Sequence, residues 1–162
     1  MDKNGFTLTE LLITVAIIGI LAMIAIPVYI GQQKRAVRVE AYTNLESLRL
    51  LEEQFFAERG RYTNDQGDEG NTPAIRDANL IDIQTSRGPG DDALPGFRPG
   101  AGTNFSYRIL QNNQLMTPVT SPPTWVASPA GTLCFVAIAT GVAGTRVADE
   151  VFAIDCFNNK NF

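Results

Sequence analysis

Glu10 is the residue whose type and position most suggest chemistry, because it is a carboxylate at the start of a long apolar run. The run from Leu11 to Ile30 carries no charge, and as a helix it spans about 30 Å, the thickness of a bilayer core. No small-residue cleavage site closes the run, so we expect it to remain in the mature protein. The run by itself predicts only a membrane anchor. That leaves the carboxylate unexplained, since a charge inside a bilayer is costly.

The groups that most catalytic and metal sites need are missing from the sequence. The chain has no histidine, which removes the commonest general base, the Ser-His and Cys-His pairs and most zinc sites. Its net charge of −4 disfavours a nucleic-acid partner. Asn64, Asp65, Asp68 and Glu69 offer oxygen ligands for calcium, but their spacing does not match an EF-hand loop. We therefore predict no catalytic residue, no metal site, no cofactor and no enzyme activity.

The two cysteines, Cys134 and Cys156, leave two interpretations open, buried thiols or one disulfide. A disulfide would contribute about 3 kcal/mol of stability and would imply an oxidising compartment. An oxidising compartment would place the C-terminal part outside the cytoplasm. The charges around the apolar run favour the opposite orientation, because Lys34 and Arg35 follow the run whereas Lys3 precedes it. Under the positive-inside rule, this distribution favours a cytoplasmic C-terminal part. The residues alone therefore leave the orientation open.

Residues 34–59 have the periodicity of an amphipathic helix that ends at Gly60. Apolar residues recur every three or four positions and predict one buried stripe, formed by Val37, Ala41, Leu45, Leu48, Leu51 and Phe55. The other faces are interpreted as solvated, and they carry Glu40, Asn44, Glu46, Arg49, Glu52 and Glu53. The apolar half of the helix has no such stripe to pack on its own domain. It must lie in lipid or against other copies, so the protein is predicted to assemble.

Gly19 and Pro27 weaken the interior of the apolar helix half. Pro27 has no backbone donor, and its ring crowds the carbonyl of Met23. A tolerated kink is one interpretation, as in many membrane helices. The alternative is a local loss of helix between Gly19 and Pro27 after assembly, which would let a filament extend.

The remainder predicts a small antiparallel sheet preceded by loops. Residues 60–104 are rich in turn formers, and β-forming residues then recur at 105–110, 115–119, 133–140 and 151–156. Pro118 cannot donate a backbone hydrogen bond to a neighbouring strand, so the second of these segments is predicted to be an edge strand or no strand. Pairing of the last two segments would bring Cys134 and Cys156 together, which makes a disulfide geometrically reasonable. The fold class is therefore α+β, a long N-terminal helix packed on a small antiparallel sheet.

The sequence also supports interpretations of individual residues in this part of the chain. Trp125 is expected to cover the sheet rather than to serve as a ligand platform. Asn104 begins an Asn-Phe-Ser triplet, a weak match to an N-glycosylation acceptor. Asp149, Glu150 and Asp155 are interpreted as solvated carboxylates.

The string from Gly5 to Leu12, GFTLTELL, resembles the processing site of type IV pilins and of the related type II secretion pseudopilins. It has a short polar leader with a lysine, then a glycine, a phenylalanine, and a glutamate at the fifth position after the glycine. Gly19 and Pro27 also stand where that family usually has a glycine and a proline. The resemblance is strongest over residues 1–35. The cysteine-bounded C-terminal region is similar to the disulfide-bounded region of many type IV pilins.

The resemblance implies specific roles. A prepilin peptidase would cut between Gly5 and Phe6 and methylate the new amine of Phe6, and Glu10 would meet that amine on a neighbouring copy. The precursor would lie in the inner membrane with its C-terminal domain outside the cytoplasm, and would then join an extracellular surface filament, a helical homopolymer. Other implied partners are an inner-membrane platform and an assembly ATPase.

The chain is divided into a leader (1–5), a hydrophobic transmembrane and filament-core helix (6–33), an amphipathic half (34–59), an αβ-loop (60–104), and a sheet with its disulfide-bounded region (105–162).

The function favoured by the resemblance is a structural subunit, the major pilin, of a type IV pilus that serves adhesion, motility or related functions. One alternative is a type II secretion pseudopilin, against which the cysteine pair argues, or a minor pilin. Another class is a single-span membrane-anchored binding protein that never polymerises. Electron conduction along aromatic residues is a further alternative. Packing is the simpler explanation for the presence of these residues.

Overall fold

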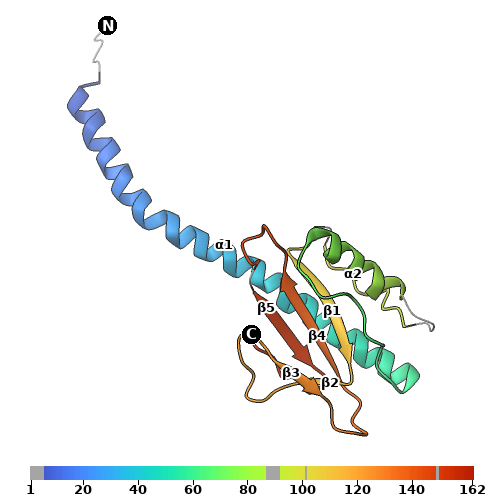
Figure 1. The fold of residues 1–162 in the computed structure, drawn as a ribbon. Helices are drawn as coiled ribbons and strands as arrows, with labels where there is room; N and C mark the ends of the chain where they lie inside the picture. The colour runs from blue at the N-terminus through green and yellow to red at the C-terminus, as the bar shows by residue number, and fades with distance from the viewer. Residues whose placement is uncertain (1–5, 87–91, 101, 149) are drawn as a thin grey trace. The chain divides into compact units, whose positions relative to one another are not determined.

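The structure is a computed structural model that describes residues 6–86, 92–100, 102–148 and 150–162 (Figure 1). The chain divides into two compact units, one ending at Ala36 and the other running from Val37 to Phe162. Helix α1, Leu8–Arg59, belongs in part to each unit. Gly60 follows the helix with φ of 72°, and its N–H donates to the carbonyl of Phe56 at 2.7 Å. The predicted helix end at Gly60 is therefore confirmed, since glycine adopts this left-handed conformation without strain.

The first unit is the apolar part of α1. Every Leu, Ile, Val and Met side chain between Leu11 and Ile30 is exposed. This part of the helix is long and apolar enough to cross a membrane, and none of that window is buried within the chain. Pro27 lies inside the helix, which continues through it.

The second unit has a three-stranded antiparallel sheet on which the later part of α1 packs. The strands are β1 (Phe105–Gln111), β4 (Phe135–Gly141) and β5 (Val151–Asp155), in the order β1-β4-β5. Four of the six predicted stripe residues are buried, and Val37 and Leu51 pack partly buried against the same core. The sheet contributes buried residues from alternate positions, such as Phe135, Ala137 and Ala139. The predicted α+β fold is therefore confirmed.

Trp125 lies in a short hairpin that covers part of the other face of the sheet. Strand β2 (Asn113–Leu115) pairs with β3 (Trp125–Ala127) in a two-stranded sheet. Leu115 packs there with Val136, Ile138 and Ala153, and Trp125 is partly buried against this cluster. Trp125 is thus a cover for the sheet, as predicted. The predicted segment 115–119 contributes only Leu115 to a strand.

Helix α2, Pro73–Thr85, lies within the stretch that the sequence analysis interpreted as loop. Its first residue is a proline, and the side chain of Thr72 accepts a hydrogen bond from the N–H of Ile75 at 3.3 Å. Ile83 is fully buried in the main core. The helix was missed because the Gly, Pro, Asn and Asp residues around it outweigh a short, weakly periodic segment.

Candidate functional site: the start of the long helix and the loops held by acidic residues

Glu10 makes a local interaction that the sequence analysis missed. The backbone N–H and the hydroxyl of Thr7 both donate to Glu10 Oε2, at 2.9 and 2.7 Å. The N–H of Glu10 in turn donates to Thr7 Oγ1 at 3.3 Å. This is a capping box, in which the residue before the helix and the third helical residue satisfy each other's free N–H groups. The signal was present in the sequence as Thr-Leu-Thr-Glu.

The capping box does not bury Glu10, whose side chain remains exposed at the start of α1. The carboxylate therefore caps the helix within one chain and still presents its charge to another molecule. Phe6 is 77% exposed, whereas Gly5, the other residue of the predicted cleavage site, lies outside the described residues. The site that the resemblance implies is thus described only on its C-terminal side.

Gly19 is not required by any packing inside the chain. A Cβ built at Gly19 would meet no atom within 4 Å other than its own helix backbone. Pro27 is likewise accommodated in a continuous α1. The weakening of the helix between these residues stays a prediction about the assembled state.

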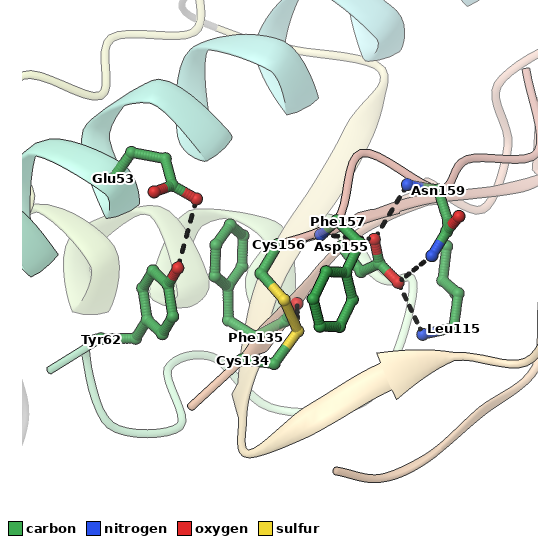
Figure 2. The surroundings of a disulfide bond; sticks show 9 residues. All are labelled: Glu53, Tyr62, Leu115, Cys134, Phe135, Asp155, Cys156, Phe157 and Asn159. Atoms are coloured by element: carbon green, nitrogen blue, oxygen red, sulfur yellow. Dashed lines mark hydrogen bonds between the residues drawn. A yellow bond between two sulfur atoms is a disulfide. The ribbon is translucent and has the colours of Figure 1, made fainter. Parts of the chain in front are cut away.

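The cysteines form a disulfide, Cys134–Cys156, at one end of the sheet (Figure 2). The neighbouring residue Asp155 is fully buried, so its interpretation as a solvated carboxylate is wrong. Its Oδ2 accepts from the N–H of Leu115 at 3.1 Å, and its Oδ1 accepts from the N–H of Asn159 at 2.9 Å. Asp155 therefore ties the turn after β5 to β2, beside the disulfide that closes the same region.

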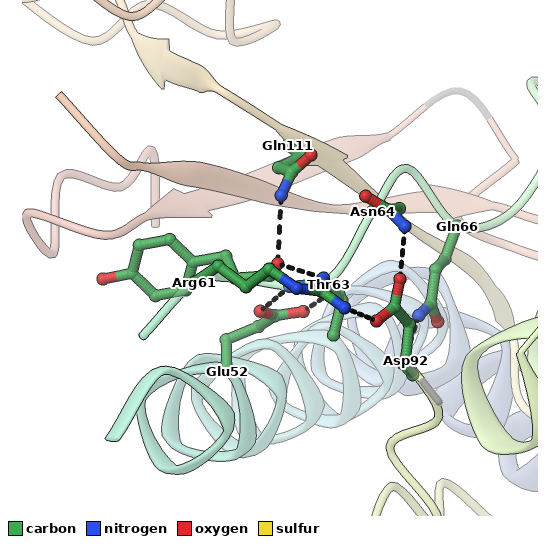
Figure 3. Close-up of polar contacts among 8 residues, drawn as sticks. Glu52, Arg61, Thr63, Asn64, Gln66, Asp92 and Gln111 are labelled. Carbon is green, nitrogen blue, oxygen red and sulfur yellow. Dashed lines mark hydrogen bonds and ion pairs between the residues drawn. The ribbon is translucent and has the colours of Figure 1, made fainter. Parts of the chain in front are cut away.

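Glu52 is the second buried acid (Figure 3). It faces away from solvent on α1 and accepts hydrogen bonds from the N–H of Thr63, at 3.1 Å, and from the Thr63 hydroxyl. Burial raises the pKa of Glu52 to about 7, although the bonds from Thr63 lower it. Nearby, Asp92 accepts from Arg61 at 2.5 Å and from Asn64. Glu52 therefore holds the segment around Thr63 against the helix, and Asp92 joins its own segment to Arg61 and Asn64.

Side chains on the face of α1 that was interpreted as solvated instead bond to other segments of the second unit. Glu40 accepts from the N–H of Asn104 at 3.0 Å and from its side-chain amide at 2.8 Å. The side-chain amide of Asn44 donates to the Tyr107 hydroxyl at 2.8 Å. These bonds, with those of Glu52, show that the solvated interpretation of this face is wrong at these positions. The Asn104 amide is engaged with Glu40, which argues against glycosylation of Asn104 in the folded chain.

Three of the four residues considered for calcium contact different partners. Asn64 bonds to Asp92, Asp65 accepts from the N–H of Gln111 at 2.7 Å, and Glu69 pairs with Arg108 at 3.8 Å. Across residues 6–86, 92–100, 102–148 and 150–162, no group of three or more acidic, histidine or cysteine side chains is placed to hold a metal ion.

Comparison with known proteins agrees with the N-terminal features. Residues 1–26 match the family described as the prokaryotic N-terminal methylation motif. The chain is 38% identical over 124 residues to the type IV major pilin protein PilA of Myxococcus xanthus, covering 72% of this chain and 56% of that protein. It is 51% identical over 47 residues to a fimbrial protein of Moraxella nonliquefaciens, covering 29% and 30% of the two chains.

A secretion protein is also similar. The type II secretion system core protein G of Pectobacterium carotovorum is 30% identical over 66 residues, covering 40% of this chain and 42% of that protein. The alignments span about half or less of these relatives' lengths. No solved structure matches the chain. Its N-terminal segment and its similarity to a pilin over most of its length show that the chain belongs to the prepilin family with an N-terminal methylation motif, which type IV pilins and secretion pseudopilins share.

Proposed function

We propose that the protein is a structural subunit, the major pilin, of a type IV pilus filament. The observation that carries the proposal is the exposure of the whole apolar part of α1, with a single carboxylate at its start. An apolar surface of this extent is stable only in lipid or against other apolar surfaces. In this function, it anchors the precursor in the inner membrane and later packs against the same part of neighbouring copies.

The N-terminal motif supports a defined order of events. A prepilin peptidase cuts between Gly5 and Phe6 and methylates the new amine of Phe6. The C-terminal domain lies outside the cytoplasm, where the disulfide Cys134–Cys156 can form. An inner-membrane platform and an assembly ATPase then add the subunit to the filament. In the filament, the charged amine of Phe6 on one copy meets Glu10 on the next.

Glu10 has two possible partners in this scheme, and they make different demands. The capping box with Thr7 requires only hydrogen-bond acceptance, whereas pairing with an amine requires a negative charge. A buried pair of opposite charges is tolerated only when both partners are in place. Glu10 thus rejects wrong alignments between copies while also capping its own helix.

Substitutions at Thr7 and Glu10 test the proposal. We expect Glu10→Ala to abolish surface filaments while the chain remains in the membrane, because the incoming amine loses its partner. Thr7→Ala is the matched control: it removes the two hydrogen bonds of the Thr7 hydroxyl, keeps the one from the backbone N–H of residue 7, and keeps the charge of Glu10. It should cost about 1 kcal/mol of helix stability and leave filaments present. Filaments are counted by electron microscopy of sheared cell surfaces. Mass spectrometry of the N-terminus checks that both variants are cut and methylated at Phe6.

Each other outcome has a clear meaning. Equal loss of filaments in both variants would show that Glu10 acts through helix capping. Normal filaments in Glu10→Ala would contradict the docking role and favour a membrane-anchored binding protein that does not polymerise. Abundant surface filaments that contain the wild-type chain distinguish a major pilin from a pseudopilin.

The pseudopilin alternative is favoured by one observation, the similarity to the secretion core protein G. The disulfide at the end of the sheet argues for the pilin, because the major pseudopilin usually lacks it. We also propose that α1 loses helical structure between Gly19 and Pro27 on assembly. Continuous helical hydrogen bonding across these residues in a filament map would contradict that step.

A further inference from the structure

The outer edge of β5, the edge that does not pair with β4, is covered by residues of the same chain. After β5 the chain turns back, and residues 159–162 lie beside this edge (Figure 1). Lys160 forms an isolated antiparallel bridge with Ile154, and the N–H of Asp155 donates to the carbonyl of Asn159 at 3.1 Å. Residues 159–162 are called the closing segment below.

Asn161 covers the rest of the edge with its side chain instead of its backbone. Its Oδ1 accepts from the N–H of Ala153 at 2.9 Å, and its Nδ2 donates to the carbonyl of Val151 at 2.9 Å. A side-chain amide carries the same kinds of donor and acceptor as a peptide group, so it satisfies the edge as a neighbouring strand would. The closing segment thus occupies one carbonyl and two N–H groups that β5 directs away from β4.

Two contacts with α1 hold the closing segment in place. The Nζ of Lys160 lies 2.6 Å from Oε1 of Glu46, and the ring of Phe162 stacks on that of Tyr42 with their centres 4.5 Å apart. These contacts fix the two residues on either side of Asn161 but supply no hydrogen bond to β5. Attachment to α1 and coverage of the strand edge are therefore divided among different side chains.

Strand β5 itself lacks the features that normally keep an edge strand from pairing with another chain. Its sequence, Val-Phe-Ala-Ile-Asp, has no lysine and no proline, and its register with β4 has no bulge. Its one acid, Asp155, is fully buried and accepts from the N–H groups of Leu115 and Asn159, so its charge does not protect the edge. Short apolar segments of β-forming residues pair readily with other chains once their edge is exposed.

Without the closing segment, the edge of β5 is complementary to the same edge of a second copy. When two such strands pair antiparallel about Ala153, each Ala153 exchanges both backbone hydrogen bonds with the other. The N–H of Asp155 then faces the carbonyl of Val151 in the second copy. A contact of this kind is symmetric and needs no other surface. The space beside the edge is open, because a hollow of about 460 Å³ is lined in part by Ser121, Val151 and Asn161.

We propose that the closing segment is an autoinhibitory strap, which prevents β5 from pairing with β5 of a second copy. The strap separates two kinds of association in one molecule. The exposed apolar part of α1 requires lipid or other copies, whereas the sheet is closed to them. This role does not depend on the proposed filament function, because an open edge would pair in any setting that brings two copies together.

Two variants open the edge without changing the length of the chain. Asn161→Ala removes the side-chain amide and keeps both contacts with α1. A triple variant, Lys160→Ser with Asn161→Ser and Phe162→Ser, removes the amide and both contacts. The matched control is Leu48→Ala, which weakens the main core and keeps the strap.

The measurements use the full chain in detergent, which covers the apolar part of α1 in every variant. Light scattering during size-exclusion chromatography gives the mass of the protein at increasing concentrations. We expect the wild type and Leu48→Ala to stay monomeric, and both strap variants to form dimers as the concentration rises. Hydrogen exchange identifies the surface. In the monomeric strap variants, the amide of Ala153 should exchange at least about tenfold faster than in the wild type, because it has lost a hydrogen bond. In the dimer its exchange should be slow again.

Several results would overturn the proposal. One is a folded triple variant that stays monomeric at every concentration, and another is equal dimerisation of Leu48→Ala, because loss of stability would then be sufficient. A dimer in which the amide of Ala153 still exchanges rapidly would place the contact on another surface. If Trp125 emission shows that the triple variant does not fold, Asn161→Ala decides alone. None of these measurements needs a filament, so a negative result leaves the proposed filament function intact, and a chain that forms no filaments still allows the test.

Discussion

The two parts of α1 use similar apolar residues in opposite ways. In the unit that ends at Ala36, Ile18 and Met23 are 64% and 77% exposed, whereas Leu45 and Leu48 in the second unit are fully buried. The first part is apolar on all sides, and the second is apolar along one stripe. A stripe is sufficient to pack on a sheet within one chain. A helix that is apolar all round needs an environment from outside the chain.

Charged residues show the same contrast. Among residues 6–36, Glu10 is the one acid, and its bonds in the described chain are to Thr7 in its own first turn. In the second unit, Glu40, Glu52 and Asp155 each accept backbone N–H groups from distant segments. Acids in the second unit therefore complete the fold of one chain. Glu10 in the first unit remains exposed and is left available to a second molecule.

Replacing one apolar residue by alanine in each unit gives the largest expected difference between the units, measured as the change in the free energy of unfolding. We expect Leu48→Ala to lower the free energy of unfolding of the domain by about 2 to 5 kcal/mol, because it leaves a cavity in a fully packed core. Ile20→Ala, at a position that is 64% exposed, should change it by less than about 0.5 kcal/mol. Urea unfolding of the full chain in detergent, followed by Trp125 emission, reports on the second unit alone. A comparable loss in both variants would show that the first unit contributes to the stability of the domain.

The periodicity of the sequence predicted the elements whose pattern is local. The buried stripe, the helix end at Gly60 and the three main strands all depend on residue types within one segment. Helix α2 was missed because its pattern is short and lies among turn formers. The capping box was also local, yet the interpretation of Glu10 as a docking residue obscured it.

The buried acids were missed for a different reason. Glu52 receives its hydrogen bonds from a residue 11 positions away, and Asp155 receives one from a residue 40 positions away. The neighbouring sequence does not indicate such distant hydrogen-bond partners. An acid on a helix or at a strand end is therefore predicted to be solvated. A pocket lined by Arg108 and Trp125 is equally non-local, since its walls come from β1, β3, β4, β5 and the loop before α2. By contrast, the motif around Phe6 and Glu10 is short and contiguous, which is why it was found.

The second expected effect concerns Glu52 and pH. In the unfolded chain, Glu52 loses its proton with a pKa of 4.5, whereas burial raises that pKa to about 7 in the fold. The folded state therefore holds an extra proton between these pH values. The contribution of Glu52 to the free energy of unfolding is largest below about pH 4.5 and falls by about 3 kcal/mol as the pH rises from there through 7. Glu52→Gln should remove this part of the dependence. Thermal unfolding from pH 4 to 8 measures it, and a slope that persists in the variant would assign it to another group.

The smallest effect is expected from the ion pair of Glu46 and Lys160, which joins α1 to the end of the second unit. The two groups lie 2.6 Å apart, and each side chain is 34% exposed. The hydrogen bond from Lys160 lowers the pKa of Glu46, so this pair stabilises the fold at neutral pH and loses its effect as the pH falls through the acid range. That dependence is opposite in sign to the dependence at Glu52.

A double-mutant cycle with Glu46→Gln and Lys160→Met isolates the pair. We expect a coupling energy of about 0.2 to 1 kcal/mol, because a partly exposed pair is screened by water and must order two flexible side chains. The coupling should shrink in high salt, whereas the loss caused by Leu48→Ala should not. A coupling well above 1 kcal/mol would mean that the pair fixes the segment around Lys160 and Phe162, whose ring stacks on Tyr42 at 4.5 Å. In that case, charge on the surface of the second unit would contribute as much to the fold as its buried acids do.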